Sequence, residues 1–304
     1  MPPANPHPIA IFISDIHLSH KPPLARALEP DWYEAMARPL REVDEAAANL
    51  NIPIICAGDL FDRWNSPAEL INFALDVLPE MCAIPGQHDL PHHSYADMKR
   101  SAFWTMVKAK RVRLLDPTNT NWIRSTGFHA FPWGFPLKNR ATRGVTKIKN
   151  ELHIAVVHAY CWVGKHKYPG APEEGHVSAF FHKGYDAMFF GDNHKGFING
   201  QLCNCGGFMR RKVDEVDSIP CYNVLYSDGE IIRMPLDCSE DIILDQTKLD
   251  EEIEKVLDVS EFIEQLQDLG SGALDFRDAV SRFLRKNSVT DSVKERVLEA
   301  VDGN

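Results

Sequence analysis

Five short apolar runs along the chain each end in acidic, histidine or amide side chains. The runs cover residues 9–14, 52–56, 81–85, 152–157 and 187–190. Runs of this length that are rich in β-branched and aromatic residues are typical of buried strands. We therefore expect five strands with polar residues at their carboxyl ends, the edge where open α/β sheets hold their ligands.

Between the first of these predicted strands, apolar residues at helical spacing predict helices. Residues 31–50 carry apolar side chains three and four positions apart, and Pro39 is expected to kink or restart that helix. Ser66 and Glu69 predict a capping box with Pro67 at the first helical position, opening a helix to about Leu78. Another helix is expected over residues 95–107. Alternating strands and helices predict a largely parallel sheet covered by helices.

A second group of strands is expected between residues 112 and 136, in a sheet that packs on the first. Residues 137–149 are predicted to form a surface connection. Residues 161–175, rich in Gly and Pro, are predicted to form a substrate-binding loop beside His158. Residues 222–236 alternate around a Ser-Asp-Gly-Glu turn, which predicts a hairpin that closes the second sheet. The expected fold class is α/β, a two-sheet sandwich of βαβ units with flanking helices and a C-terminal helical tail.

The domain boundary is predicted at about residue 240. Beyond it the chain becomes acidic, with apolar residues at helical spacing that a Gly-Ser-Gly break interrupts. We assign residues 1–240 to one domain and residues 241–304 to an acidic helical region, whose apolar face must be buried against another surface, such as that of a partner. The alternative is a helical bundle that packs on its own domain.

The net charge of −10 is carried entirely by residues 237–304, and residues 1–236 are balanced. Basic side chains gather in the balanced part, over residues 138–149, 165–167 and 210–212. Such clusters suit a phosphate backbone, although a solvated basic face is the alternative. The candidate substrate contacts among them are Lys165, Lys167, Arg210 and Arg211.

The cysteines, the apolar runs and the first ten residues indicate the cellular compartment. Seven cysteines are too scattered for a disulfide framework, and Cys203 and Cys205 lack a second pair at zinc-site spacing, so free thiols are expected. No apolar run is long enough to span a bilayer, and the first ten residues do not read as a signal peptide. We therefore expect a cytoplasmic protein with no membrane association.

The polar strand ends are the candidate site. Carboxylate, imidazole and amide groups are the donors that a cluster of divalent metal ions requires. At any one position a polar turn after a buried strand is the alternative, but five in succession favour a metal centre. The residues concerned are Asp15, His17, Asp59, Asp62, Gln87, His88, Asp89, His158, Asp192 and His194.

In chain order these motifs read Asp-x-His, Gly-Asp-x-x-Asp, Gly-Gln-His-Asp, His and Gly-Asp-x-His. The order resembles that of the calcineurin-like metallophosphoesterase superfamily over residues 9 to about 196. Residues 58–63, 127–133 and the segment after His194 are most similar to the SbcD-type branch of DNA repair and recombination nucleases, which includes phage enzymes. The resemblance implies a two-sheet metallophosphoesterase sandwich.

The resemblance also implies a two-metal site. By position, the first ion would be held by Asp15, His17, Asp59 and His194. The second would be held by Gln87, His158 and Asp192, with Asp59 bridging the two ions.

The remaining motif residues take roles by the same resemblance. His88 would protonate the leaving oxygen, with Asp89 orienting it, and Asp62 would support the metal ligands. Arg63 joins the candidate substrate contacts.

Two positions depart from the family pattern, because Gln87 stands where the family has Asn and Asp192 where it has His. Gln keeps the amide oxygen but lengthens its reach. Asp replaces a neutral nitrogen with a charged oxygen, which favours Mn²⁺, or Mg²⁺, over zinc. Occupancy of the second metal site is therefore an open question.

The implied function is a Mn²⁺-dependent DNA nuclease, acting as exonuclease, endonuclease or both, in an SbcC/SbcD-like complex. The implied partners are DNA and an SMC-like ATPase of the SbcC type, bound through the C-terminal helices; related nucleases usually form homodimers. Two alternatives remain. One is a small-molecule phosphodiesterase or phosphomonoesterase, and the other is a scaffolding subunit with a weakened second metal site.

Overall fold

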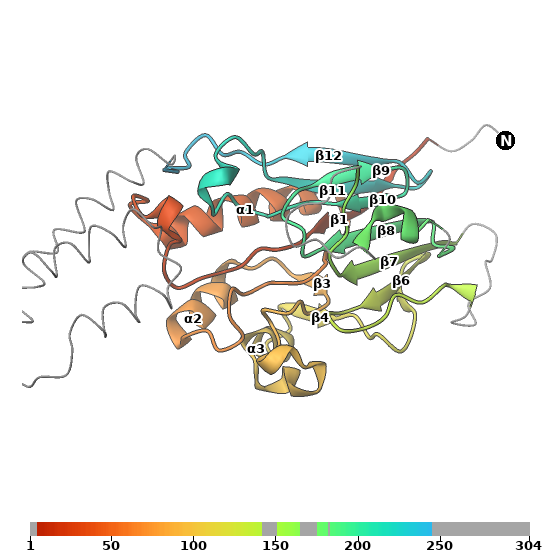
Figure 1. The fold of residues 1–304 in the computed structure, drawn as a ribbon, viewed down its shortest axis with the longest axis horizontal. Helices are drawn as coiled ribbons and strands as arrows, with labels where there is room; N and C mark the ends of the chain where they lie inside the picture. The colour runs from red at the N-terminus through yellow and green to blue at the C-terminus, as the bar shows by residue number, and fades with distance from the viewer. Residues whose placement is uncertain (1–4, 142–150, 165–174, 182, 245–304) are drawn as a thin grey trace, which may run out of the picture. The chain divides into compact units, whose positions relative to one another are not determined.

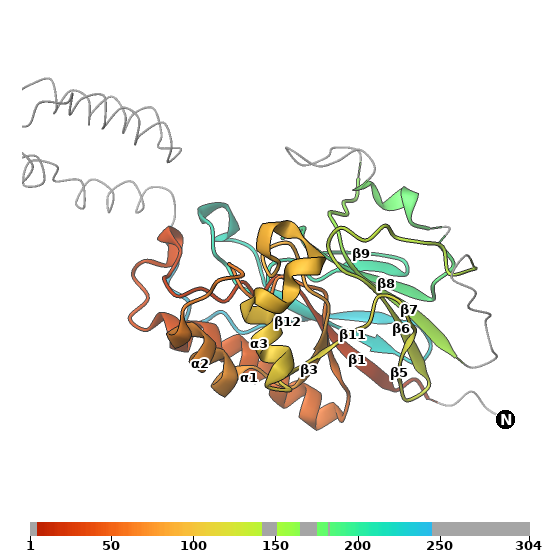
Figure 2. The same cartoon turned by 90° about the horizontal axis from the view of Figure 1, so that it is seen from below.

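Two six-stranded sheets and three α-helices form the described part of the chain in this computed structural model (Figure 1). The structure describes residues 5–141, 151–164, 175–181 and 183–244. Those up to Ile243 belong to one compact unit. Figure 2 shows the helices on one side of the first sheet and the second sheet on its other side. The fold is the expected α/β sandwich.

The first sheet has the order β12-β11-β1-β2-β3-β4. Its strands are β1 (Pro8–Ile13), β2 (Ile54–Cys56), β3 (Met81–Ala83), β4 (Val112–Leu114), β11 (Cys221–Tyr226) and β12 (Ile231–Pro235). The second sheet has the order β5-β6-β7-β8-β10-β9. Its strands are β5 (Asn121–Ile123), β6 (Thr126–Phe131), β7 (Leu152–His158), β8 (Ala187–Gly191), β9 (Phe197–Asn199) and β10 (Leu202–Asn204). In both sheets the central strands run parallel.

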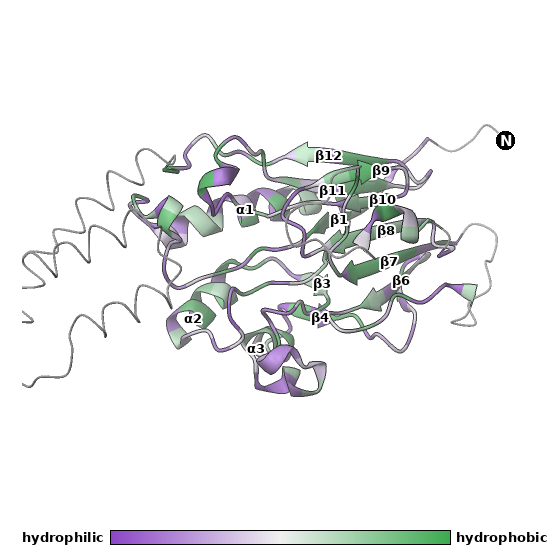
Figure 3. Cartoon of the chain, in the orientation of Figure 1, coloured by the Kyte–Doolittle hydropathy of each residue, from purple (hydrophilic) through white to green (hydrophobic). Residues whose placement is uncertain are grey.

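Alternate residues of each central strand point to opposite faces of its sheet and so belong to two separate hydrophobic cores. In β1, Ala10 and Phe12 face the second sheet, whereas Ile11 and Ile13 belong to the cluster under the helices. Between the sheets, the Phe12 ring stacks on Phe189 of β8. Strands β7 and β8 are strongly hydrophobic (Figure 3) because both of their faces are covered.

Helix α1 (Trp32–Leu50) begins where the Asp31 side chain accepts a hydrogen bond from the Glu34 backbone N–H. It continues through Pro39, so the helix does not restart there, contrary to one of the two predicted effects of this proline. Proline removes a single helical hydrogen bond, and the buried face that includes Met36 and Leu40 holds the helix on the sheet regardless.

The predicted capping box is also wrong. Helix α2 (Ala68–Val77) begins after Pro67, and the Ser66 hydroxyl donates to the Arg63 carbonyl at 2.8 Å instead of capping the helix. The helix expected over residues 95–107 is split into a 3-10 helix, Tyr95–Arg100, and α3 (Ala102–Lys108). Ser101 divides them because its side chain accepts the Trp104 N–H and starts a new helix.

Two strand assignments need correction. Strand β4, expected in the second sheet, pairs with β3 in the first. The predicted hairpin is present as β11 and β12, but β11 pairs antiparallel with β1, so the hairpin extends the first sheet and not the second. This pairing gives the edge of β1 a hydrogen-bonding partner, which local alternation could not identify.

Several predictions fall wholly or partly outside the described residues. They concern the connection at 137–149, the loop at 161–175 and the tail from 245 onward, and they stay predictions, as does the domain boundary at 240. All seven cysteines are free, as predicted. In the described part of the chain, no helix combines the length and apolar character that crossing a membrane needs.

Candidate metal centre

The polar ends of five strands meet at one edge of the sandwich. Strands β1, β2 and β3 of the first sheet lead to Asp15, Asp59 and Gln87, and strands β7 and β8 of the second lead to His158 and Asp192. All five strands run in register with parallel neighbours, so their carboxyl ends point to the same edge.

The backbone at these ends departs from the extended form. The chain leaves β1 at Ile13, so Asp15 and His17 do not continue the alternation of the strand. Left-handed backbone conformations bring the side chains together instead. The φ angles are 54° at Asp15, 50° at His17, 54° at Asp59 and 85° at Asp192. Such conformations cost free energy and concentrate at functional sites.

Glycines let the strand ends approach each other. Gly58 has φ +106°, and a Cβ there would lie 2.2 Å from Nδ1 of His158. A Cβ at Gly86 would lie 2.1 Å from Oδ1 of Asp59. Any side chain at either position would push a candidate ligand aside, so space requires both motif glycines, and at Gly58 the backbone conformation requires glycine as well.

One donor cluster consists of Asp15, His17 and His194. Nε2 of His17 lies 3.1 Å from Nε2 of His194, and 3.8 Å from Oδ2 of Asp59. Burial lowers the pKa of His17 well below its ordinary value, so its ring is neutral, the form that binds a metal. Together with Asp59, the three residues of this cluster make up the set predicted for the first ion.

A second donor cluster consists of Asp15, Asp59 and His158. Nε2 of His158 lies 3.3 Å from Oδ2 of Asp59. Although Asp59 is fully buried, this oxygen finds no hydrogen-bond partner among the described residues. An orphaned carboxylate oxygen between two imidazoles fits a bound cation, which would supply the missing partner.

The charges in this cluster depend on one another. Burial alone would raise the pKa of Asp59, but His158 and His17 hold it below its ordinary value, so Asp59 is ionised. Burial would lower the pKa of His158, but Asp59 raises it to about 10. Burial raises the pKa of Asp15 to about 6. The site thus concentrates negative charge at Asp59, where the resemblance places the bridging ligand.

Gln87 and Asp192, the two departures from the family pattern, bond to each other. Nε2 of Gln87 donates to Oδ1 of Asp192 at 2.7 Å, and its Oε1 lies 2.6 Å from Nε2 of His158. Asp192 lies in none of the three donor clusters that the described residues form. The Gln87 amide therefore links Asp192 to the second cluster, and a direct metal bond from Asp192 stays a prediction.

His88 forms a third donor cluster with His17 and Asp62. Its Nδ1 is 2.9 Å from the Asp62 carbonyl, and its backbone N–H donates to Oδ1 of Asp59. Its ring meets that of His17 edge to face, with centroids 4.9 Å apart. Since a carbonyl only accepts, Nδ1 carries a proton and Nε2 is the nitrogen left for a substrate.

Asp89 does not orient His88, contrary to the prediction. Its carboxylate is fully buried and accepts from the backbone N–H groups of Leu60, Phe61 and Gly86. Burial and the charge of Asp59 raise the pKa of Asp89 to about 7, against those three donors. Asp89 instead ties the segment after β2 to the segment after β3, and the Asp62 carbonyl holds His88.

The predicted substrate contacts have different surroundings. Arg63 is exposed, and Lys165 and Lys167 lie outside the described residues. Arg210 forms a 3.1 Å ion pair with Asp241, which leaves it little freedom to reach a substrate. Arg211 donates to the Asp62 carboxylate at 2.9 Å and to the His17 carbonyl.

Glu215 was missed by the sequence reasoning. Its Oε1 lies 3.7 Å from Nδ1 of His194, and its Oε2 accepts from the backbone N–H groups of Arg211 and Lys212. The only local signal is an acidic residue four positions after Arg211 in a basic stretch. That spacing says nothing of His194, which β9 and β10 separate from Glu215 in the chain.

A hollow of about 520 Å³ opens beside His194. The side chains that line it include Asp192, Lys195, Lys212, Ile219 and Arg233, and it is not enclosed. The three basic side chains among the lining residues, Lys195, Lys212 and Arg233, are matched by three acidic ones, Asp192, Asp214 and Glu215, so the hollow offers charges of both signs beside an apolar wall.

Three solved structures of similar fold are distant in sequence. The calcineurin-like phosphoesterase YfkN from Bacillus subtilis is 11% identical with TM-score 0.40, over 81% of this chain and 95% of that one. A putative 5'-nucleotidase from Staphylococcus aureus, solved with alpha-ketoglutarate, is 12% identical with TM-score 0.45, over 82% and 58%. A metallophosphoesterase from Sphaerobacter thermophilus is 13% identical with TM-score 0.34, over 76% and 90%. We conclude nothing about the site from similarities of this size.

No curated protein matches the sequence significantly. The family model described as calcineurin-like phosphoesterase matches residues 10–196, more than half of the chain, and this stretch contains both donor clusters and His88. The chain belongs to the calcineurin-like phosphoesterase family.

Proposed function

We propose that the protein is a metal-dependent DNA nuclease that hydrolyses phosphodiester bonds in DNA repair or recombination. Membership of the family makes it a phosphoester hydrolase. The observation that supports a polymeric substrate is the unenclosed hollow beside His194, with Lys195, Lys212 and Arg233 on its walls. A small-molecule hydrolase needs a closed pocket, whereas a nucleic-acid backbone needs an open approach with basic side chains.

The donor set fits two divalent ions, and Mn²⁺ is proposed, with Mg²⁺ as the alternative. Asp15, His17 and His194 would hold the first, His158, Gln87 and Asp192 the second, and Asp59 both. When bound, such ions activate water and offset the charge that builds on the phosphorus oxygens. Carboxylate and amide oxygens on the second ion favour a hard cation.

His88 is the proposed proton donor to the leaving oxygen. The Asp62 carbonyl fixes the ring through Nδ1, and the bond from the His88 backbone N–H to Asp59 fixes its distance from the clusters. Because the ring is fixed, the remaining nitrogen, Nε2, can donate a proton only to a group on that side of the ring. This orientation makes His88 an acid for a substrate bound at the two clusters.

The partners remain part of the proposal. An SMC-like ATPase of the SbcC type would bind the C-terminal region, and two nuclease chains would pair as a homodimer. Pull-down of a candidate ATPase by the full chain, compared with a chain ending at residue 244, tests the first of these.

The decisive experiment is cleavage of a labelled linear duplex in Mn²⁺ by the wild type and by His88→Asn. We expect cleavage by the wild type and a loss of about 10²- to 10⁴-fold in the variant, the range for one proton-transfer group. His92→Asn is the matched control, because His92 is exposed on the same loop and its φ of 53° suits Asn.

Two outcomes would contradict the proposal. Rapid turnover of small phosphoesters without DNA cleavage would favour the small-molecule hydrolase. Fewer than two bound ions per chain, with neither substrate turned over, would favour a scaffolding subunit. The position of Asp192 outside all three donor clusters of the described residues is the observation that keeps this second candidate open.

A further inference from the structure

The segment from Arg210 to Glu215 contacts the metal centre through the side chains of Arg211 and Glu215. The side chain of Arg210 anchors the segment on the other side. We infer that Arg211 and Glu215 are positioning residues. Glu215 orients His194 toward the metal. Arg211 holds Asp62, whose backbone carbonyl holds the ring of His88. The inference rests on the metal-dependent chemistry proposed above.

Glu215 reaches His194 from behind. Nε2 of His194 faces His17 at 3.1 Å, and its other ring nitrogen, Nδ1, lies 3.7 Å from the Glu215 carboxylate. Histidine ligands commonly give their second N–H to a carboxylate, which sets the ring orientation and the tautomer. Glu215 is itself held by the Arg211 and Lys212 backbone N–H groups at 2.7 and 3.0 Å.

Arg211 acts on the other side of the site. Its guanidinium donates to the Asp62 carboxylate at 2.9 Å and to the His17 carbonyl. The Asp62 carbonyl in turn holds Nδ1 of His88 at 2.9 Å. The Arg211 side chain is 12% exposed, so a substrate phosphate could engage it only by displacing these protein partners. We therefore assign it to positioning in place of the substrate contact predicted from the sequence.

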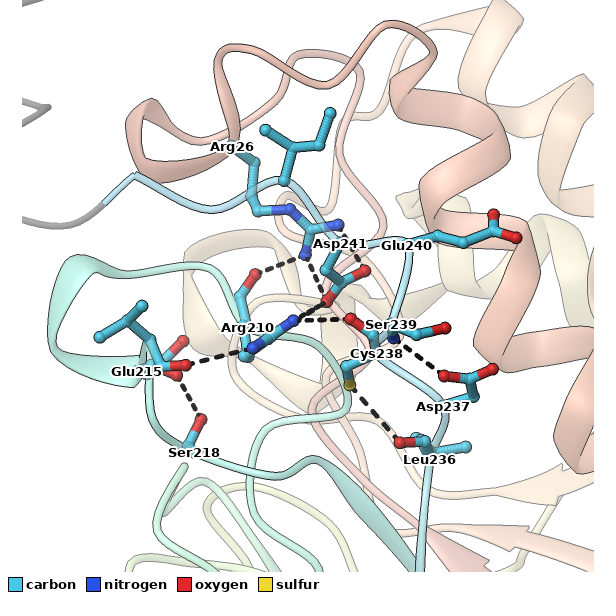
Figure 4. Close-up of polar contacts among 12 residues, drawn as sticks. Arg26, Arg210, Glu215, Ser218, Leu236, Asp237, Cys238, Ser239, Glu240 and Asp241 are labelled. Carbon is cyan, nitrogen blue, oxygen red and sulfur yellow. Dashed lines mark hydrogen bonds and ion pairs between the residues drawn. The ribbon is translucent and has the colours of Figure 1, made fainter.

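A buried ion-pair network anchors the segment. The Arg26 and Arg210 guanidinium groups both point at the Asp241 carboxylate (Figure 4), at 2.8 and 3.1 Å. Arg26 also donates to the Arg210 carbonyl at 2.9 Å, and its side chain is 1% exposed. Because Arg210 is held from one side, the next residue, Arg211, is presented to the metal centre in a fixed direction.

Calorimetric titration of the full-length protein with Mn²⁺ tests the role of Glu215. We expect Glu215→Gln to weaken the tighter Mn²⁺ site by about 10- to 100-fold, the usual effect of removing a carboxylate that supports a histidine ligand. Asp217→Asn is the control, since it removes the same charge from an exposed position two residues further along. Thermal melts without metal show whether either variant has lost its fold.

The outcomes separate the two levels of the proposal. If the wild type binds no Mn²⁺, the proposed function and the inference both fail. If the wild type binds Mn²⁺ and Glu215→Gln binds it equally well, the inference fails and the proposed function stands. A lower melting temperature with unchanged Mn²⁺ affinity would make Glu215 purely structural and would also overturn the inference.

Kinetics on DNA separate positioning from substrate contact at Arg211. Arg211→Lys keeps the charge but cannot reach the Asp62 carboxylate and the His17 carbonyl together. We expect kcat to fall about tenfold or more with KM nearly unchanged. A raised KM with normal kcat and a weaker dependence on salt would show a phosphate contact and would contradict positioning. Arg100→Gln, at an exposed site, is the control.

Discussion

Asp59 organises the candidate site at the scale of single residues. It is fully buried, its Oδ1 accepts the His88 N–H, and its Oδ2 lies between His17 and His158. A carboxylate in this position is stable only because two imidazoles face it, and a cation there would complete its coordination. The chemistry therefore depends on how closely neighbouring backbone can approach this one side chain.

Gly86→Ala tests that closeness. A Cβ at Gly86 would lie 2.1 Å from Oδ1 of Asp59, so the methyl group must displace the carboxylate. We expect loss of tight Mn²⁺ binding in calorimetric titration. Gly207→Ala is the matched control, since a Cβ there meets nothing closer than 3.5 Å although Gly207 also lies near His194. Equal Mn²⁺ affinity in the two variants would show that the Asp59 geometry is not required.

At the scale of secondary-structure elements, the site is built by the segments that follow the strands and not by the strands themselves. The segments that follow β1 and β2 bond to each other through Asp15 N–H to the Gly58 carbonyl and His17 N–H to the Asp59 carbonyl, each at 3.0 Å. The segment after β3 joins them through Asp89. Three loop segments are thereby tied together before any substrate arrives, which reduces the entropy that binding must remove.

Asp89→Ala should destabilise the fold. Three buried N–H groups would lose their acceptor, and we expect the free energy of unfolding to fall by about 3 kcal/mol or more. Asp89→Asn should cost less, because its amide oxygen still accepts. Urea denaturation followed by circular dichroism measures both. Asp97→Ala, at a partly exposed site, should change little; a loss at Asp89 no larger than at Asp97 would refute the tie.

Both sheets contribute ligands at the scale of the whole molecule. The first sheet supplies Asp15, His17 and Asp59, and the second supplies His158 and His194. Between these ligands and the rest of the interface lies an apolar layer that includes the Phe12 and Phe189 stack. Any ion bound by both donor clusters therefore also links the two sheets.

Removing metal should lower thermal stability. Because an ion that binds only the folded state stabilises it, we expect the melting temperature to rise on adding Mn²⁺ and to fall again with EDTA. Asp59→Asn should abolish most of the rise, since it weakens the ligand shared by both ions. The rise would be measured by differential scanning calorimetry. A rise of the same size in Asp59→Asn would place the stabilising ion elsewhere.

The sequence by itself determined the sandwich, the order of its central strands along the chain and the residues at their ends. Apolar runs with polar tips are local patterns, and parallel strands must present those tips at one edge. Spacing alone thus led to Asp15, Asp59 and His158.

Only the tertiary structure decided which distant segments meet. Pairing of β11 with β1, the three N–H donors of Asp89, and the contacts of Arg211 and Glu215 each join segments of different loops or strands. Such contacts follow no period of 2.0 or 3.6 residues, because chain geometry repeats only within an element. The candidate ligands could therefore be found in the sequence, while the side chains that hold them in place could not.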